Sequence, residues 1–212
     1  MLWLMTVALA ADWNALRSAD GWEEVVDRTI DIGRVQVARR DIGGMWCLRA
    51  EGHSNATPDH LMDVLWDVER APAWSSNTLL VSDVLVPGAD HMVFWQQLDV
   101  SMIHDRFWVL DVTAVRDVDG TRGFRWDQVD AASQWPAVVA HAQSLDSEAM
   151  QPPVMWGEWL FEPTGAVDRS TRVIWRGCQD IGGVIPMWLQ AWAGARALPN
   201  AVADLVHEAE RR

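Results

Sequence analysis

The side chains that could perform acid–base, nucleophilic or metal chemistry are scattered along this sequence. Its six histidines form neither the i, i+4 pair of a helical zinc site nor a short cluster with cysteine. There is no nucleophile elbow and no phosphate loop, because Gly43-Gly44 and Gly182-Gly183 are isolated glycine pairs. Acidic residues such as Glu23 and Glu24 are numerous, but their spacing selects no pair for general acid–base catalysis. The sequence therefore gives no positive argument for catalysis, and we expect neither a metal nor a cofactor.

The composition predicts a globular chain with an acidic surface. Apolar residues make up 50% and charged residues 22% of its 212 positions, which is typical of one folded domain. Seventeen basic against thirty acidic residues give a net charge of −13, which argues against nucleic acid as a partner and against adhesion to anionic membranes. Lysine and tyrosine are absent, whereas there are fifteen tryptophans. Genomic bias alone could produce these counts, but indoles also suit the wall of an apolar pocket.

The first segment has features of an export signal. Residues 1–11 contain an apolar stretch that ends in Ala8-Leu9-Ala10, a small-x-small cleavage pattern, although no basic residue precedes it. We expect either a signal peptide or a buried helical turn here, followed by a single domain at residues 12–212. Export to the periplasm or the medium would permit a disulfide, whereas a cytoplasmic chain would keep Cys47 and Cys178 reduced.

Hydrophobic periodicity predicts an α+β domain built on an antiparallel sheet. Two short helices, starting at Thr57-Pro58-Asp59, should separate the third strand from the fourth. A long amphipathic helix is expected at residues 186–211, kinked at Pro199. The expected strands are residues 22–27, 33–40, 45–53, 78–86, 91–100, 106–115, 122–129, 154–161 and 171–179.

Asp119-Gly120 predicts a hairpin with a two-residue loop between two of these strands. With that loop, Asp111 lies opposite Gln128 and Thr113 lies opposite Trp126. Asp111 would then share one face of the sheet with Trp126 and Gln128.

Several segments, in order, resemble the START family of steroidogenic-acute-regulatory-related lipid transfer domains. Asp67–Trp74 resembles the family's D-x-x-x-R-x-x-W turn, and His104–Val109 resembles its R-D-F-V strand with Arg and Asp exchanged. Asp180–Leu189 resembles D-x-G-G-x-I/L-P-x-W-L at the entry to the final helix, and Pro199 followed by Leu205 continues the pattern. The resemblance spans about residues 21–205 and suggests a bacterial-type, single-domain member.

This resemblance implies a helix-grip fold, in which a curved antiparallel sheet of about nine strands wraps around the long C-terminal helix, with two short inner helices. It further implies a tunnel that binds a lipid, a sterol-like compound or another hydrophobic small molecule and carries it without chemistry or a cofactor. We expect transient membrane contact and a monomer. The alternatives are a polyketide cyclase or aromatase on the same fold, and a ligand-sensing module that acts on a protein partner.

The resemblance also suggests which residues contact the ligand. Gln96 and Asp111 match positions where some members carry an acid and an arginine, and Gln128 would complete a polar cluster if Asp111 is not solvated on the outside. Since the third and last strands are neighbours in this family, a disulfide between Cys47 and Cys178 is also implied. The expected apolar contacts are Phe94, Trp126, Trp159, Trp175, Trp188 and Trp192.

Overall fold

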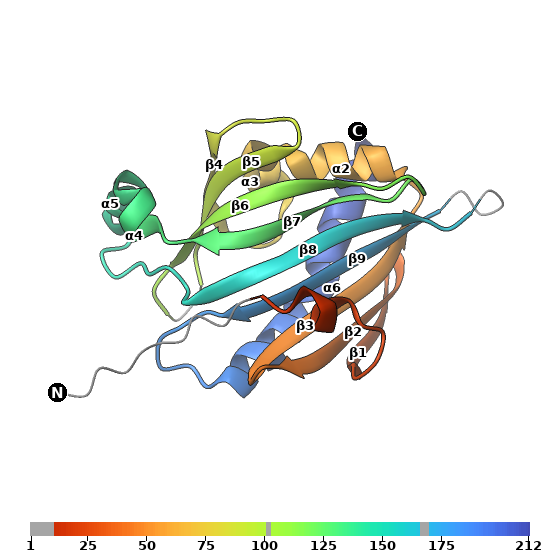
Figure 1. Cartoon of the computed structure of the whole chain (residues 1–212), viewed down its shortest axis with the longest axis horizontal. Helices are drawn as coiled ribbons and strands as arrows, with labels where there is room; N and C mark the ends of the chain where they lie inside the picture. Colours follow the sequence, from red (N-terminus) through yellow and green to blue (C-terminus); the bar gives the residue numbers. More distant parts are fainter. Residues whose placement is uncertain (1–10, 101–102, 166–169) are drawn as a thin grey trace.

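An antiparallel sheet forms the framework of the chain in a computed structural model (Figure 1). The structure describes residues 11–100, 103–165 and 170–212, so residues 1–10 of the predicted signal peptide lie outside the described residues. Within the described ranges the sheet has nine strands in the order β1-β2-β3-β9-β8-β7-β6-β5-β4. The strands are β1 (Glu23–Ile30), β2 (Gly33–Ile42), β3 (Met45–Ser54), β4 (Leu79–Val86), β5 (His91–Leu98), β6 (Arg106–Arg116), β7 (Arg122–Val129), β8 (Val154–Pro163) and β9 (Thr171–Asp180).

The helices occupy the connections and the C-terminus. Between β3 and β4 lie two short helices and a 3-10 turn, as expected from Thr57, whose side chain caps the first of them, and from Pro58. The helical elements are α1 (Trp13–Arg17), α2 (Pro58–Trp66), η1 (Val68–Arg70), α3 (Ala71–Trp74), α4 (Ala131–Gln134), α5 (Pro136–Leu145) and α6 (Met187–Arg211).

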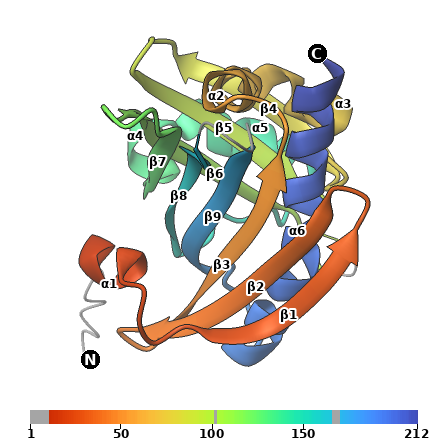
Figure 2. The same ribbon diagram turned by 90° about the vertical axis from the view of Figure 1, so that its right-hand side faces the viewer.

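The sheet curves around α6, which crosses its concave face (Figure 2). This helix packs mainly on β3, β2 and α2, and it continues through Pro199 as one element. Close approach is possible because Gly52 of β3 faces the helix, where an added Cβ would lie 3.0 Å from a methyl group of Val202. The predicted helix-grip fold is confirmed.

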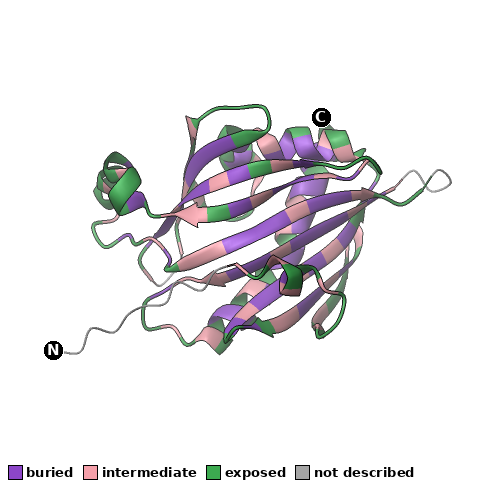
Figure 3. Ribbon diagram, viewed as in Figure 1, coloured by how far each residue is buried: buried purple, intermediate pink, exposed green. Residues whose placement is uncertain are grey.

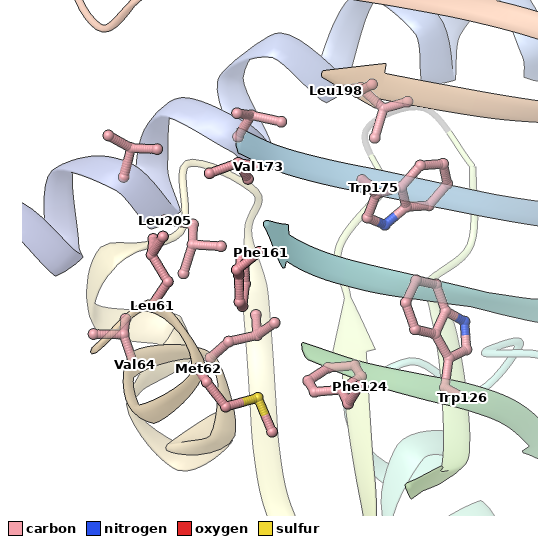
Figure 4. Packing of buried hydrophobic residues seen from close by; sticks show 14 of the residues in the cluster. Leu61, Met62, Val64, Phe124, Trp126, Phe161, Val173, Trp175, Leu198 and Leu205 are labelled. Atoms are coloured by element: carbon pink, nitrogen blue, oxygen red, sulfur yellow. The ribbon is translucent and has the colours of Figure 1, made fainter. Parts of the chain in front are cut away.

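The largest apolar core lies between the sheet, α2 and α6. Leu61 of α2, Phe161 of β8 and Leu205 of α6 are fully buried and meet at one end of this core (Figure 4). Buried residues occur in runs along the central strands, such as residues 156–158 of β8 and 173–175 of β9 (Figure 3), because successive side chains point to opposite faces of a sheet and both faces are covered here. The inner positions of these strands therefore fill the concave side.

The predicted register of the β6–β7 hairpin is wrong by one residue. The strands close at the pair Arg116 and Arg122, so the loop has five residues in place of the two predicted at Asp119-Gly120. Asp111 consequently faces Asp127, and it shares a face with outward-pointing residues rather than with Trp126.

A disulfide links β3, in the N-terminal half of the chain, to β9, in the C-terminal half. Cys47 of β3 and Cys178 of β9 are direct cross-strand partners, with Cα atoms 4.2 Å apart. Both are fully buried on the convex side, where Leu16 of α1 covers them and Trp13 packs edge-on against Trp156. The structure thus contains the pairing that the resemblance implied.

Candidate ligand-binding cavity

A cavity of about 310 Å³ lies between α6 and the concave face of the sheet. Residues from the sheet, from η1, α2 and α3, and from α6 contribute to its wall. Its lining consists of Leu48, Leu65, Val68, Ala71, Trp74, Ser75, Asn77, Leu79, Phe94, Gln96, Leu98, Trp108, Leu110, Phe124, Trp126, Met155, Trp159, Trp175, Gln179, Gly194, Ala197, Leu198, Ala201 and Leu205. No ionisable side chain occurs among these described residues, so the wall is neutral as well as mostly apolar.

Two glycines allow two indoles to cover the floor of the cavity. Gly157 of β8 and Gly177 of β9 are paired across the strands. A Cβ added to Gly157 would lie 2.6 Å from the Trp126 ring, and one added to Gly177 would lie 2.6 Å from the Trp175 ring. The two rings lie 6.0 Å apart and project to the same side of the sheet (Figure 4). Small residues at these two positions therefore leave room for a broad aromatic surface.

One row of polar side chains crosses three neighbouring strands at the cavity. Ser82, Gln96 and Trp108 are cross-strand partners on β4, β5 and β6. The Trp108 indole donates to Gln96 Oε1 at 3.2 Å, and the Gln96 amide donates to Ser82 Oγ at 2.9 Å. Ser82 donates in turn to the carbonyl of Val68 at 2.6 Å. Gln96 is therefore held in one orientation by its neighbours.

Other indole donors of the wall have no partner. Within the described part of the chain, Nε1 of Trp74 and Nε1 of Trp126 are both enclosed and donate to no acceptor. An enclosed N–H without an acceptor costs about 1–3 kcal/mol, so such a group near a cavity favours a ligand that can accept from it.

Five of the nine predicted contact residues lie around this cavity. Phe94, Gln96, Trp126, Trp159 and Trp175 all contribute to its wall. Alternation along the strands brings them together, because each occupies an inward position.

The structure places two of the predicted polar contacts elsewhere, which corrects the proposed polar cluster. Asp111 lies on the convex face, where its carboxylate is 2.7 Å from Nε2 of His91. Gln128 lies at the end of β7, where its amide donates to the carbonyl of Pro152 at 2.6 Å. The hairpin register explains Asp111, because a slip of one residue places it on the face opposite to Trp126, whereas Gln128 stays on the face of Trp126 but lies beyond the cavity wall.

The two predicted tryptophans of α6 also point away from the cavity. Trp188 and Trp192 are 64% and 51% exposed, and the Arg196 guanidinium stacks 3.9 Å above the Trp192 ring. The side of α6 that lines the cavity instead carries Gly194, Ala197 and Leu198. Hydrophobicity alone selected the indoles, although the small residues are the ones that leave room for a ligand.

Sequence reasoning missed two further indoles of the wall, Trp74 and Trp108. Trp108 could have been found from the alternation of Trp108, Leu110 and Val112, which share the inward face of β6. Trp74 ends α3, and no periodic signal in so short a helix indicates its direction.

The convex face carries charges that the cavity lacks. Asp127 lies opposite Asp111, and burial together with the Asp111 carboxylate raises the pKa of Asp127 above its ordinary value. Glu158 of β8 is fully buried and pairs with Arg17, Arg125 and Arg176 at 3.0, 3.3 and 3.1 Å. These groups attach α1 to the back of the sheet and do not approach the cavity.

The described residues form neither a metal site nor a helix that could span a membrane. They contain no group of three or more His, Cys, Asp or Glu side chains placed to hold a metal ion. Within the same ranges, no helix combines the length and the apolar character needed to cross a bilayer.

Comparison with known proteins gives similarity in structure but not in sequence. No family model matches the chain, and no curated protein sequence matches it. A STAR-related lipid transfer protein from Xanthomonas axonopodis superposes with a TM-score of 0.73 at 19% identity, covering 90% of this chain and 99% of that one. Human STARD10 superposes with a TM-score of 0.75 at 15% identity, covering 93% of this chain and 76% of STARD10.

An enzyme also has a similar structure. The Zhui aromatase/cyclase from Streptomyces sp. R1128 superposes with a TM-score of 0.51 at 15% identity, covering 78% of this chain and 94% of that one. The nine-stranded sheet, the gripped C-terminal helix and these superpositions agree. The chain therefore has the helix-grip fold found in STAR-related lipid transfer domains.

Proposed function

We propose that this protein binds a lipid or another hydrophobic small molecule in the cavity and carries it without changing it chemically. The observation that supports this most strongly is the neutral, aromatic-rich cavity enclosed by α6 and the sheet. A concave, mostly apolar site with a few placed polar groups is typical of small-molecule binding. Removing apolar ligand surface from water contributes about 25 cal/mol per Å², before the costs of association.

Exchange of the ligand requires the wall to open. Ala197 and Asn77 line the cavity and are also exposed, so the cavity reaches the surface between α6 and the segment before β4. We place the gate there, because movement of the helix or of this rim segment would widen the opening.

The exposed end of α6 supports a brief contact with a membrane. Val184, Trp188, Leu189 and Trp192 are large apolar residues that remain exposed on this helix and on the loop before it. Indoles favour the interface between lipid and water. Because the chain carries a net charge of −13, contact through these apolar side chains suits a neutral lipid surface better than an anionic one.

The disulfide supports a site of action in an oxidising compartment, the periplasm or the medium. Disulfides are rare in the reducing cytosol, and Cys47 and Cys178 are directly opposed in the sheet. The apolar segment at residues 1–11 agrees with export.

Carrier function is preferred to a cyclase activity on the same fold. Acid–base catalysis requires an ionisable side chain in contact with the substrate. Asp111, the acid that the sequence suggested, lies on the convex face and pairs with His91. The described lining residues offer no other acid or base.

Native mass spectrometry of the purified full chain tests the proposal. We expect one bound hydrophobic molecule per chain, or uptake of one from mixed liposomes. Ala197→Trp should reduce occupancy because Ala197 lines the cavity, whereas Ala193→Trp, one turn earlier on the exposed side of α6, should not. An empty chain that takes up nothing from liposomes would contradict carrier function.

A further inference from the structure

The size and neutrality of the cavity restrict its ligand. A volume of about 310 Å³ is at the low end of the ~300–1,000 Å³ of small-molecule sites, so the cavity suits a compact molecule rather than a lipid with two acyl chains. A carboxylate or phosphate inside it would lose hydration, and none of the described lining residues carries a compensating charge. The ligand should therefore be uncharged.

The aromatic residues of the wall indicate the shape of the ligand. Five tryptophans and two phenylalanines line the cavity. Trp126 and Trp175 extend over Gly157 and Gly177, so this part of the wall presents ring surface, whereas leucines and one valine line other parts. Aromatic rings pack best against other flat rings, in offset or edge-on arrangements.

The polar groups of the wall indicate its chemistry. The Gln96 oxygen already accepts from Trp108, whereas the indole N–H groups of Trp74 and Trp126 have no acceptor among the described residues. Asn77 and Gln179 near the wall carry amides that can donate or accept, but the enclosed polar atoms of the lining that have no partner are both donors, and they suit carbonyl or ether oxygens on the ligand.

We propose that the cavity binds a compact, uncharged molecule with a flat ring system whose polar groups are hydrogen-bond acceptors, as in a quinone or an aromatic ketone. This inference rests on the proposed carrier function and narrows its ligand class. Trp126 is the principal donor because it lines the cavity, its side chain is almost fully buried and its N–H has no partner among the described residues.

Calorimetric titration of the full chain with defined probes tests this proposal. The probes are 2-methyl-1,4-naphthoquinone, 2-methylnaphthalene, cholesterol, palmitate and dioleoylphosphatidylcholine. Both cysteines are in the disulfide, so the quinone meets no free thiol with which it could react. We expect the quinone to bind at least tenfold more tightly than each of the other four compounds.

A pair of conservative variants measures how much the hydrogen bond from the Trp126 N–H contributes to quinone binding. Trp126→Phe keeps a ring but removes the donor, and it should weaken quinone binding about three- to tenfold while leaving 2-methylnaphthalene binding unchanged. Trp156→Phe is the matched control, because its N–H is also enclosed without a partner but packs under α1 on the convex side. That variant should bind both ring compounds as the original chain does.

Each other outcome has a definite meaning. Tighter binding of cholesterol, palmitate or the phospholipid than of the quinone would overturn the ligand class but leave carrier function intact. Equal weakening of quinone and hydrocarbon in Trp126→Phe would overturn the role of its N–H. Failure to bind any of the five compounds would overturn this inference, and carrier function would fail too if liposomes also supplied no ligand.

Discussion

At the residue scale, the most constrained charge is Glu158, which is 0% exposed and contacts three arginines on the convex face. Glu158→Gln keeps the shape of the side chain but leaves the guanidinium groups of Arg17, Arg125 and Arg176 without their counter-charge. Breaking a buried ion pair costs about 3–5 kcal/mol, and we expect about 3 kcal/mol because two of these arginines are partly hydrated. Urea unfolding measures this loss.

Glu162→Gln is the control for this prediction. Glu162 lies on the same strand but is partly exposed and pairs only with Arg172 among the described residues. Exposed ion pairs contribute about 0–1 kcal/mol to stability, so this variant should lower the free energy of unfolding by less than about 1 kcal/mol. Similar losses in the two variants would refute a special role for Glu158.

A second residue-scale prediction concerns pH. The raised pKa of Asp127 means that the folded chain holds this proton more tightly than the unfolded chain does. Its contribution to stability is therefore favourable below the ordinary carboxyl pKa and is lost as the pH rises through the raised value. Asp127→Asn should increase the free energy of unfolding at pH 7 by a few tenths of a kcal/mol, because like charges on opposed strand positions destabilise by about 0.2–1 kcal/mol.

The same comparison at pH 3 provides the check on Asp127. Asp127 is then largely protonated, so the advantage of the Asp127→Asn variant should disappear. An advantage that persists unchanged at pH 3 would assign the effect to packing and not to charge.

At the scale of elements, the β6–β7 hairpin explains why part of the site was predictable and part was not. Alternation and turn signals located the strands, and inward positions such as Phe94, Trp159 and Trp175 followed from them. The register of β6 against β7 could not be predicted in the same way, because Asp119-Gly120 lies inside a five-residue loop. In this loop the Asp117 N–H donates to the Thr121 carbonyl. That one-residue difference moved Asp111 to the convex face.

The pairing of β3 with β9 allows an element-scale prediction about stability. Replacing both Cys47 and Cys178 by alanine removes a link between residues 131 positions apart. Chain-entropy arguments assign about 4–5 kcal/mol to a loop of that length. We expect the double variant to unfold at a correspondingly lower guanidinium concentration.

Reduction separates the contribution of the disulfide to stability from the contribution of packing around the two cysteines. Dithiothreitol should lower the stability of the original chain toward that of the Cys47→Ala, Cys178→Ala variant and should not affect the variant. A loss below about 1 kcal/mol on reduction would contradict the prediction that the link constrains the unfolded chain.

At the scale of the whole molecule, the exposed end of α6 should govern contact with lipid. Replacing Trp188 and Trp192 together by alanine removes two indoles that are more than half exposed. We expect partitioning onto phosphatidylcholine vesicles to fall at least tenfold, because indoles supply most of the apolar area of this surface. Vesicle sedimentation measures this partitioning.

Leu145→Ala is the matched control for that experiment. Leu145 ends α5 and is 51% exposed, as is Trp192, but it belongs to a different part of the surface. Partitioning that falls equally in this variant, or that is unchanged without the two indoles, would argue against α6 as the contact surface.

The position of β9 between β3 and β8 has a consequence for synthesis on the ribosome. β3 pairs with β2 on one side, but its partner on the other side is the last strand of the chain. Until residues 171–180 have left the ribosome, a sheet of β1, β2 and β3 has β3 as a second unpaired edge in addition to β1. During translation the nascent chain thus exposes a row of free backbone donors and acceptors along β3, and Cys47 cannot form its disulfide until Cys178 has been synthesised.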